Sequence, residues 1–277
     1  MRNRLAIKRR LRSHVCVPVS SPRHQAGQAT IEYLYVLPVL LLILLASLQF
    51  IFIYEAKQTL NYAAFVGTRN GALNAGDMGM IEAGVASGLA PLFAHGDSTD
   101  GGADNLTGLK VAHALAVSEL SNASLARIEI LNPTPSALDA FGGTIPNDNL
   151  MYRPSDDIKG GVNVQDANLL KVRVTYCVRL VVPLVNRMIY AFTVAPPSTP
   201  DKADTLSIND RYSPAELLKN SVGTGASNAL CVVPNDPYPY RIPVTAEAVV
   251  RMQTAFTDPG SSAVKDDTNN KWTTALP

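Results

Sequence analysis

The chain has 277 residues, enough for one or two ordinary domains, and only 17% of them are charged. Its formal net charge of +1 hides a split, because residues 1–27 hold seven of the 24 basic residues and no acidic residue. The other 17 basic residues face 23 acidic ones, so the body of the chain is mildly acidic. This balance excludes the basic face that nucleic-acid binding needs, and we expect no nucleic acid among the partners.

An uncharged apolar run follows the basic segment. Tyr33 to Tyr54 are 22 residues without a charge, and a helix of this length would span ~33 Å, the thickness of a bilayer's hydrocarbon core. Tyrosines stand near both ends of the run, as interfacial aromatic residues do. The alternative is a buried helix of a soluble protein, but the run is longer than most core helices. The sequence therefore predicts a transmembrane span at residues 33–54.

The charge split also predicts the orientation of this span. Basic residues flank the cytoplasmic side of membrane helices, so the N-terminus should be cytoplasmic and the C-terminal part should lie outside. A conventional cleaved signal peptide would have a shorter apolar core that ends at a small-x-small site. Here the apolar run continues beyond Ala46, Ser47 and Leu48.

The same helix is expected to continue out of the membrane, over residues 28–76 in all. Small and apolar residues recur there at three- and four-residue spacing: Ala56, Leu60, Ala63, Ala64 and Gly67. Asn70-Gly71 and Asn74-Ala75-Gly76 then supply stop signals. Small residues let helices approach closely, so the stripe packs either against other helices or against the protein's own outer domain.

Residues 77–277 are predicted to form one extracytoplasmic α+β domain, because helical patterns precede strand patterns. In Leu169 to Val182, apolar and polar residues alternate, so that Val172, Val174, Tyr176 and Val178 share one face. The predicted elements are helices at 80–92, 109–120 and 213–220, strands at 125–131, 169–182 and 241–254, and loops at 95–105, 142–161 and 195–210.

A short motif joins the basic segment to the apolar run. Gly27-Gln28-Ala29-Thr30-Ile31-Glu32-Tyr33 resembles the end of the prepilin-type leader of type IV pilins and pseudopilins. In that family a membrane aspartyl peptidase cuts after a glycine that lies five residues before a glutamate. The resemblance implies a leader at residues 1–27, cleavage between Gly27 and Gln28, and Glu32 as the fifth residue of the mature chain.

The pair Glu32-Tyr33 narrows the resemblance to the Flp/Tad branch. Ile31 to Pro38 is similar to the run with which TadE-like proteins begin, and Ala63 to Arg69 is similar to their Ala-Ala-x-x-Gly-x-Arg helix. Gln165 to Lys171 is more weakly similar to longer pilus-assembly relatives. Asp97 to Asp100 lack the Asp-x-Ser-x-Ser of a metal-dependent adhesion site, which argues against the larger TadG-like relatives.

The resemblance implies a minor pseudopilin or assembly component of a Tad/Flp-type pilus and secretion system, not an enzyme. It would lie in the bacterial inner membrane with its C-terminal domain in the periplasm. Its partners would be prepilin peptidase, other Tad pilins and pseudopilins, the inner-membrane assembly platform and the lipid bilayer. Whether it enters the extracellular filament or only assists assembly stays open.

Glu32 stands where a carboxylate needs a partner or water, so it is a candidate functional residue. The resemblance implies that it meets the new amine on Gln28 of a neighbouring subunit. Alternatively, Glu32 and Tyr33 only mark the membrane edge, since acidic residues also suit the N-terminus of a helix.

The three cysteines divide between the two sides of the membrane. Cys16 belongs to the leader, whereas Cys177 and Cys231 lie in the exported part, where an oxidising compartment favours a disulfide over two unpaired thiols. His95 and His113 have no metal-ligand spacing with these cysteines, and no catalytic motif is present, so we expect no catalytic residues, metal or cofactor. The rival hypothesis is a membrane-tethered periplasmic binding module or enzyme with an uncleaved anchor.

Overall fold

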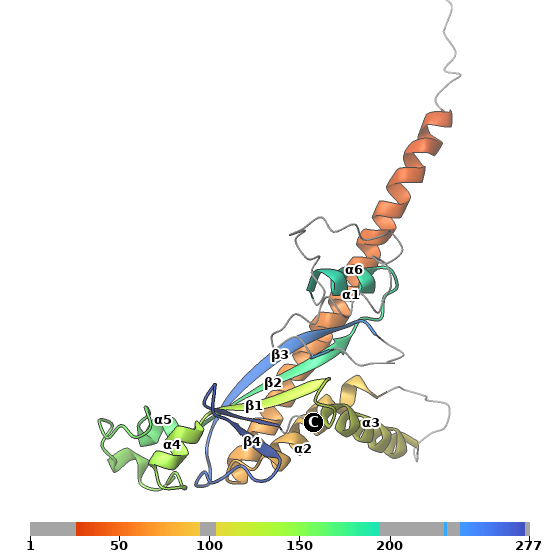
Figure 1. Ribbon diagram of the computed structural model, residues 1–277. Coiled ribbons are helices and arrows are strands. Elements are labelled where there is room, and N and C mark those ends of the chain that lie inside the picture. The colour runs from red at the N-terminus through yellow and green to blue at the C-terminus, as the bar shows by residue number, and fades with distance from the viewer. Residues whose placement is uncertain (1–25, 95–103, 194–229, 232–238, 275–277) are drawn as a thin grey trace, which may run out of the picture. The chain divides into compact units, whose positions relative to one another are not determined.

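Figure 1 shows the computed structural model, which describes residues 26–94, 104–193, 230–231 and 239–274. The expected helix at 213–220, the expected loop at 195–210 and nearly all of the leader lie outside the described residues. So do residues 95–103 of the loop predicted at 95–105, whereas residues 104–105 are helical. The chain divides into two units, Met1–Leu44 and Leu45–Pro277, which are described separately below. Its longer elements are α1 (Ala26–Leu73), α2 (Met78–Leu89), α3 (Asp104–Leu120), α6 (Val185–Thr193), β1 (Ala126–Asn132), β2 (Leu169–Arg179) and β3 (Arg241–Arg251).

The short elements lie mainly between the strands and after β3. They are α4 (Pro135–Ala140), α5 (Val164–Ala167), β4 (Ala263–Asp266), β5 (Lys271–Thr274) and the single-turn 3₁₀ helices Ala90–Leu92 and Leu150–Tyr152. Helices at the predicted positions 80–92 and 109–120 are therefore confirmed, with the first ending in a 3₁₀ turn. The region 142–161 is mostly irregular, as predicted, apart from its 3₁₀ turn.

The first unit contains the N-terminal part of α1, which is 48 residues long in all. Among the described helices, only the part of α1 from Glu32 to Leu73 is long and apolar enough to cross a membrane. Just 6% of its most apolar stretch is buried, which is not how the core helix of a soluble protein behaves. Pro38 interrupts the backbone ladder of α1, as proline commonly does in membrane helices. The helix fits a single-pass membrane protein.

The second unit is built on a five-stranded antiparallel sheet with the order β3-β2-β1-β5-β4. The alternation in β2 places its apolar side chains on one face, as predicted: Val172, Val174, Tyr176 and Val178 are all buried. Two strand ends were predicted too late, because β2 ends at Arg179 and β3 at Arg251. Arg179 pairs with Arg241 in the last row of the β2–β3 ladder, and Pro183, which lacks a backbone donor, follows soon after.

One face of this sheet packs against the C-terminal half of α1, with α2 and α3 completing the layer (Figure 1). The small residues of α1 fit directly against α2. A Cβ atom added to Gly84 would lie 2.7 Å from the Cα atom of Gly67, and one added to Gly88 would collide with Ala63. The small-residue stripe is therefore used, at these positions, for packing within the second unit of the protein itself.

The turn after α1 corrects one of the two predicted stop signals. Gly71 lies inside the helix, where a side chain would collide with Ile81, so Asn70-Gly71 does not end α1. The second signal does, because Ala75 and Gly76 have φ of 55° and 86° and the Gly76 amide donates to the Gly71 carbonyl. The long apolar helix and the mixed helix–sheet domain confirm the predicted α+β class.

Candidate functional site

The predicted processing motif occupies the first turns of α1. The helix begins at Ala26, so Gly27 and Gln28 lie in its first turn. Glu32 follows Gln28 by four residues, a spacing that puts both on one side of a helix. Glu32 is exposed, as is Tyr33 with 65% of its surface. This places a carboxylate and an aromatic residue at the start of the apolar run.

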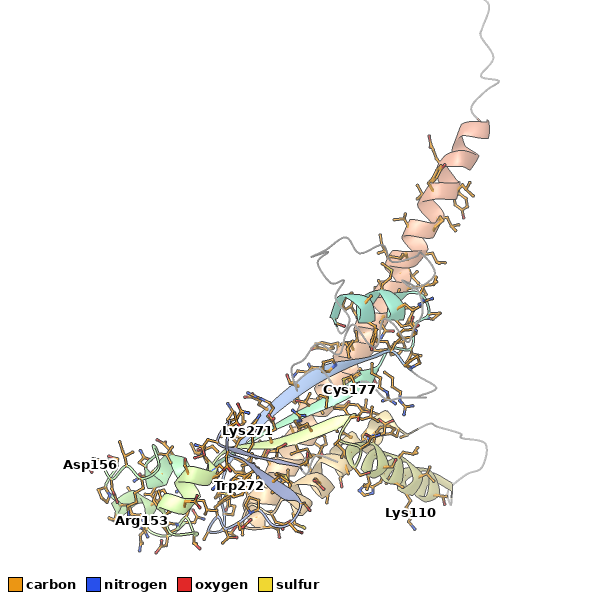
Figure 2. The ribbon with its side chains drawn as sticks, viewed as in Figure 1. Lys110, Arg153, Asp156, Cys177, Lys271 and Trp272 are labelled. Atoms are coloured by element: carbon orange, nitrogen blue, oxygen red, sulfur yellow. A yellow bond between two sulfur atoms is a disulfide. The ribbon has the colours of Figure 1, made fainter. Side chains whose placement is uncertain are left out.

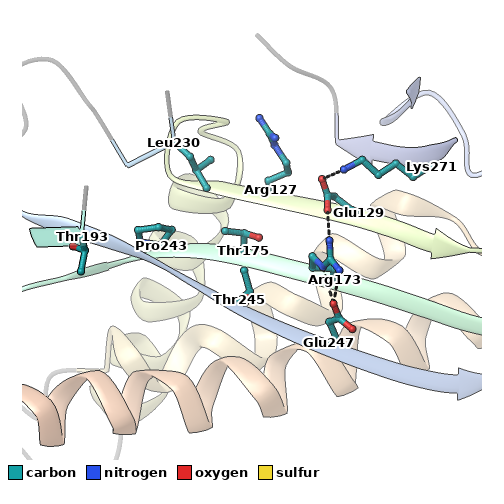
Figure 3. A pocket seen from close by; sticks show the side chains of 10 residues that line it. All are labelled: Arg127, Glu129, Arg173, Thr175, Thr193, Leu230, Pro243, Thr245, Glu247 and Lys271. Atoms are coloured by element: carbon teal, nitrogen blue, oxygen red, sulfur yellow. Dashed lines mark hydrogen bonds and ion pairs between the residues drawn. The ribbon is translucent and has the colours of Figure 1, made fainter. Parts of the chain in front are cut away.

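A row of charged side chains crosses the sheet on the face opposite α1 (Figure 3). Lys271 of β5 lies 2.6 Å from Glu129 of β1, whose other carboxylate oxygen is 3.7 Å from Arg173 of β2. Arg173 in turn lies 2.6 Å from Glu247 of β3, which also pairs with Lys171 at 2.9 Å. Hydrogen bonds from Lys171 and then Arg173 hold the pKa of Glu247 below its ordinary value. We call these five residues the charged ladder.

Four residues of the charged ladder, Glu129, Arg173, Glu247 and Lys271, line a cavity of about 470 Å³. Arg127, Thr175, Pro243 and Thr245 complete much of its lining, together with Thr193 and Leu230 (Figure 3). Its carboxylates already bind basic partners, so the cavity offers no free acid, and Arg127 adds a further basic side chain to its wall. Among the residues that the structure describes, no three His, Cys, Asp or Glu side chains gather as they would around a metal ion.

A second ionic cluster is buried under the end of the sheet and was not found from the sequence. Glu119 of α3 accepts hydrogen bonds from Tyr176 and Arg179 of β2, and Arg241 of β3 lies 3.5 Å from it. The side chains of Glu119 and Arg241 are only 10% and 4% exposed. Burial first, and the Glu119 carboxylate second, raise the pKa of the Tyr176 phenol. Glu119 thus joins α3 to two strands.

Cys177 and Cys231 lie together beside this cluster, and Cys177 is labelled in Figure 2. Cys177 of β2 and Cys231 form a disulfide with a Cα–Cα distance of 5.3 Å. Both residues are buried, and their amides donate to Leu125 and Ser124. The bridge therefore ties Cys231 to β2 and to the turn between α3 and β1.

The comparisons with known proteins bear on the N-terminal motif alone. The family model described as TadE-like protein matches residues 27–69, from the predicted processing site through the Ala63–Arg69 helix. The match confirms the resemblance that the sequence motifs indicated, and it indicates a protein associated with a Tad pilus. No match was found among curated proteins or solved structures.

Proposed function

We propose that this TadE-like chain is a minor pseudopilin or assembly component of a Tad/Flp-type pilus and secretion system, anchored in the bacterial inner membrane. The observation that carries this proposal is that the family match and the apolar helix occupy the same part of the chain. The family match at residues 27–69 covers most of the one described helix that could cross a membrane. The TadE-like family is a family of pilus components rather than enzymes, which supports a structural role.

The proposed topology has a cytoplasmic N-terminus and a periplasmic outer domain. The seven basic residues before the apolar run support this orientation. A buried Cys177–Cys231 disulfide in the second unit is also what an oxidising compartment favours. Prepilin peptidase, other Tad pilins and the inner-membrane platform are the partners that this placement makes accessible.

The proposed mechanism is helix packing. After cleavage, the apolar part of α1 stays in lipid or in a filament core, and Glu32 pairs with the Gln28 amine of a neighbouring subunit. An amine and a carboxylate in a low dielectric attract strongly, and either one left alone is costly. The close packing of Gly67 against Gly84 and of Ala63 against Gly88 would fix the outer domain to its own segment of α1.

N-terminal sequencing of the protein from cells with active prepilin peptidase tests this proposal. We expect the mature chain to begin at Gln28, and a Gly27→Leu variant to keep its leader because the peptidase requires a small, permissive residue there. Cells without the peptidase provide the control, in which the wild-type chain keeps its leader. A wild-type chain that begins at Met1 despite active peptidase contradicts the pseudopilin proposal and favours an uncleaved anchor.

Glu32→Ala separates the two roles considered for this carboxylate. If Glu32 pairs with a neighbouring amine, the variant should insert normally but lose pilus or secretion output, and Glu32→Asp should be intermediate. Normal output from Glu32→Ala at normal protein levels would show that Glu32 only marks the membrane edge.

A periplasmic binding module is the rival function, and the charged ladder is the feature that bears on it. The cavity of about 470 Å³ is large enough for a small molecule. Its acidic groups, however, are bound by Lys171, Arg173 and Lys271, so the cavity presents no unpaired carboxylate to a cationic ligand. The assembly role is therefore better supported.

A further inference from the structure

Gln49 is a polar side chain within the apolar run of α1, and it is completely buried. Its side-chain oxygen accepts a hydrogen bond of 2.8 Å from the backbone amide of Val182. Val182 belongs to the short connection between β2 and α6. The outer domain therefore supplies the partner of Gln49, and this connection lies against α1 inside the apolar run.

The position of Gln49 along α1 shows how far below the end of the apolar run the segment between β2 and α6 lies. Gln49 precedes Tyr54, the end of the apolar run, by five residues, or ~7.5 Å along a helix axis. Amphipathic segments that lie in a membrane interface bury their apolar face ~5–10 Å below the surface. The segment Val181–Met188 thus stands at the depth of an interfacial element if the run ends at the membrane surface.

The side chains of this segment divide into two sets. Val185 is buried and Ile189 is half-buried against the domain's core, whereas Val181, Leu184 and Met188 are 67%, 64% and 44% exposed. Phe50 and Ile51, which follow Gln49 on α1, are also 62% and 58% exposed. Arg187 is exposed as well, in a position to serve anionic headgroups. Apolar exposure therefore continues from α1 onto the outer domain.

The backbone at Leu184 adopts a conformation that is unusual for a leucine. Leu184 has φ of 68°, in the left-handed region that residues with a side chain seldom adopt. Glycine or asparagine would take this conformation with less strain. The chain instead holds a leucine there with most of its surface exposed, and such strain often marks a functional position.

We infer that the segment Val181–Met188 is a second membrane contact, which inserts its exposed apolar side chains into the interface of a phospholipid bilayer beside α1. The inference rests on the proposed function in one respect, the insertion of α1 into that bilayer. Val181, Leu184 and Met188 enter the acyl boundary, and Arg187 stays at the level of the headgroups. The outer domain is then held at the membrane by two elements instead of one.

Tryptophan probes in the full chain test this inference. Leu184→Trp and Met188→Trp would be reconstituted in vesicles of phosphatidylethanolamine and phosphatidylglycerol, with or without brominated acyl chains. Met151→Trp is the matched control, because Met151 is an apolar residue of the same domain with 90% exposure, far along the chain from α6. Trp272, the only native tryptophan, gives a background that wild-type protein measures.

We expect brominated lipid to quench the Leu184→Trp and Met188→Trp probes at least twofold more than the Met151→Trp probe, and aqueous iodide to show the reverse order. Iodide quenching of all three probes alike would overturn the inference. Probes protected from both quenchers would also overturn it, because a second protein copy would then cover the segment. A chain that does not float with the vesicles contradicts the membrane anchor as well, which distinguishes failure of the proposed function. A far-UV circular dichroism spectrum like that of wild type in each variant reports an intact fold.

Discussion

Glu119 carries more of the domain's stability than its place on a helix would indicate. Its carboxylate is the acidic partner of both Arg179 and Arg241, and it also accepts the Tyr176 hydroxyl. Removing one partner of a buried ion pair typically costs about 3–5 kcal/mol, and the side chain of Arg241 is only 4% exposed. The cost of removing Glu119 is therefore expected to exceed the stabilisation that its ion pairs contribute.

We expect Glu119→Ala to lower the free energy of unfolding by about 3–5 kcal/mol. Lys110→Ala is the matched control on the same helix, because Lys110 is exposed and should change stability by less than about 0.5 kcal/mol. Urea denaturation of the full chain in detergent, followed by far-UV circular dichroism, measures both. Equal midpoints for the two variants would contradict this role of Glu119.

Sequence reasoning could not have found this cluster. Glu119 is 57, 60 and 122 positions away from Tyr176, Arg179 and Arg241, so no local pattern links them. By contrast, the pairing of Cys177 with Cys231 could be expected from compartment and count alone, because only two cysteines fall in the predicted exported part. Long-range ionic contacts depend on strand register, which the sequence leaves undetermined.

The packing of α1 on α2 depends on two glycines of α2, Gly84 and Gly88, which face small residues of α1. At Gly84 an added Cβ would lie 2.7 Å from the Cα of Gly67, and neither backbone can move without shifting its helix. Gly108 of α3 has no heavy atom within 4 Å of such a Cβ. The same substitution should therefore have opposite effects at these two sites.

We expect Gly84→Ala to destabilise the domain by about 1–3 kcal/mol through overpacking. Gly108→Ala should instead be neutral or stabilise by up to about 1 kcal/mol, because alanine favours the helix. Thermal unfolding of both variants beside wild type measures the difference. A Gly84→Ala protein as stable as wild type would show that α1 and α2 do not pack this closely.

Elements with a long, regular pattern were predictable, and short ones were not. The apolar run predicted α1, and strict alternation predicted β2 together with its buried face. Strands β4 and β5 have four residues each, too few for an alternation to stand out. Their place in the sheet is set by partners such as β1, through Glu129 opposite Thr273 and Ile130 opposite Trp272. Helix α6 was not predicted, because no sequence signal for a helix start precedes its nine residues. The turn before it, with the positive φ of Leu184, is visible only in the structure.

At the scale of the whole molecule, the Cys177–Cys231 bridge closes a large part of the outer domain. The two cysteines are 54 positions apart, and the segment between them includes α6. In the chain-entropy model a loop of this length stabilises the folded state by roughly 4 kcal/mol, with the mechanism model-dependent. Reduction of the Cys177–Cys231 disulfide should therefore lower the stability of the whole domain.

We expect neither Cys177 nor Cys231 to react with maleimide in the denatured, unreduced mature protein, and both to react after reduction. Cys16 is an internal control, because the uncleaved chain should carry one reactive thiol in its leader and the cleaved chain none. Mass spectrometry of the labelled peptides assigns each site. Labelling of both outer-domain cysteines without reductant would disprove the bridge.

The strand order also has a consequence for biosynthesis. Strand β5 lies between β1 and β4, so Lys271–Thr274 belong to the interior of the sheet, with Trp272 in the core and Lys271 on Glu129. A ribosome makes these residues long after α1 has emerged, and until they arrive β1 has an open edge, a site for non-native pairing. The five-stranded sheet can therefore form only after Lys271–Thr274 have been synthesised.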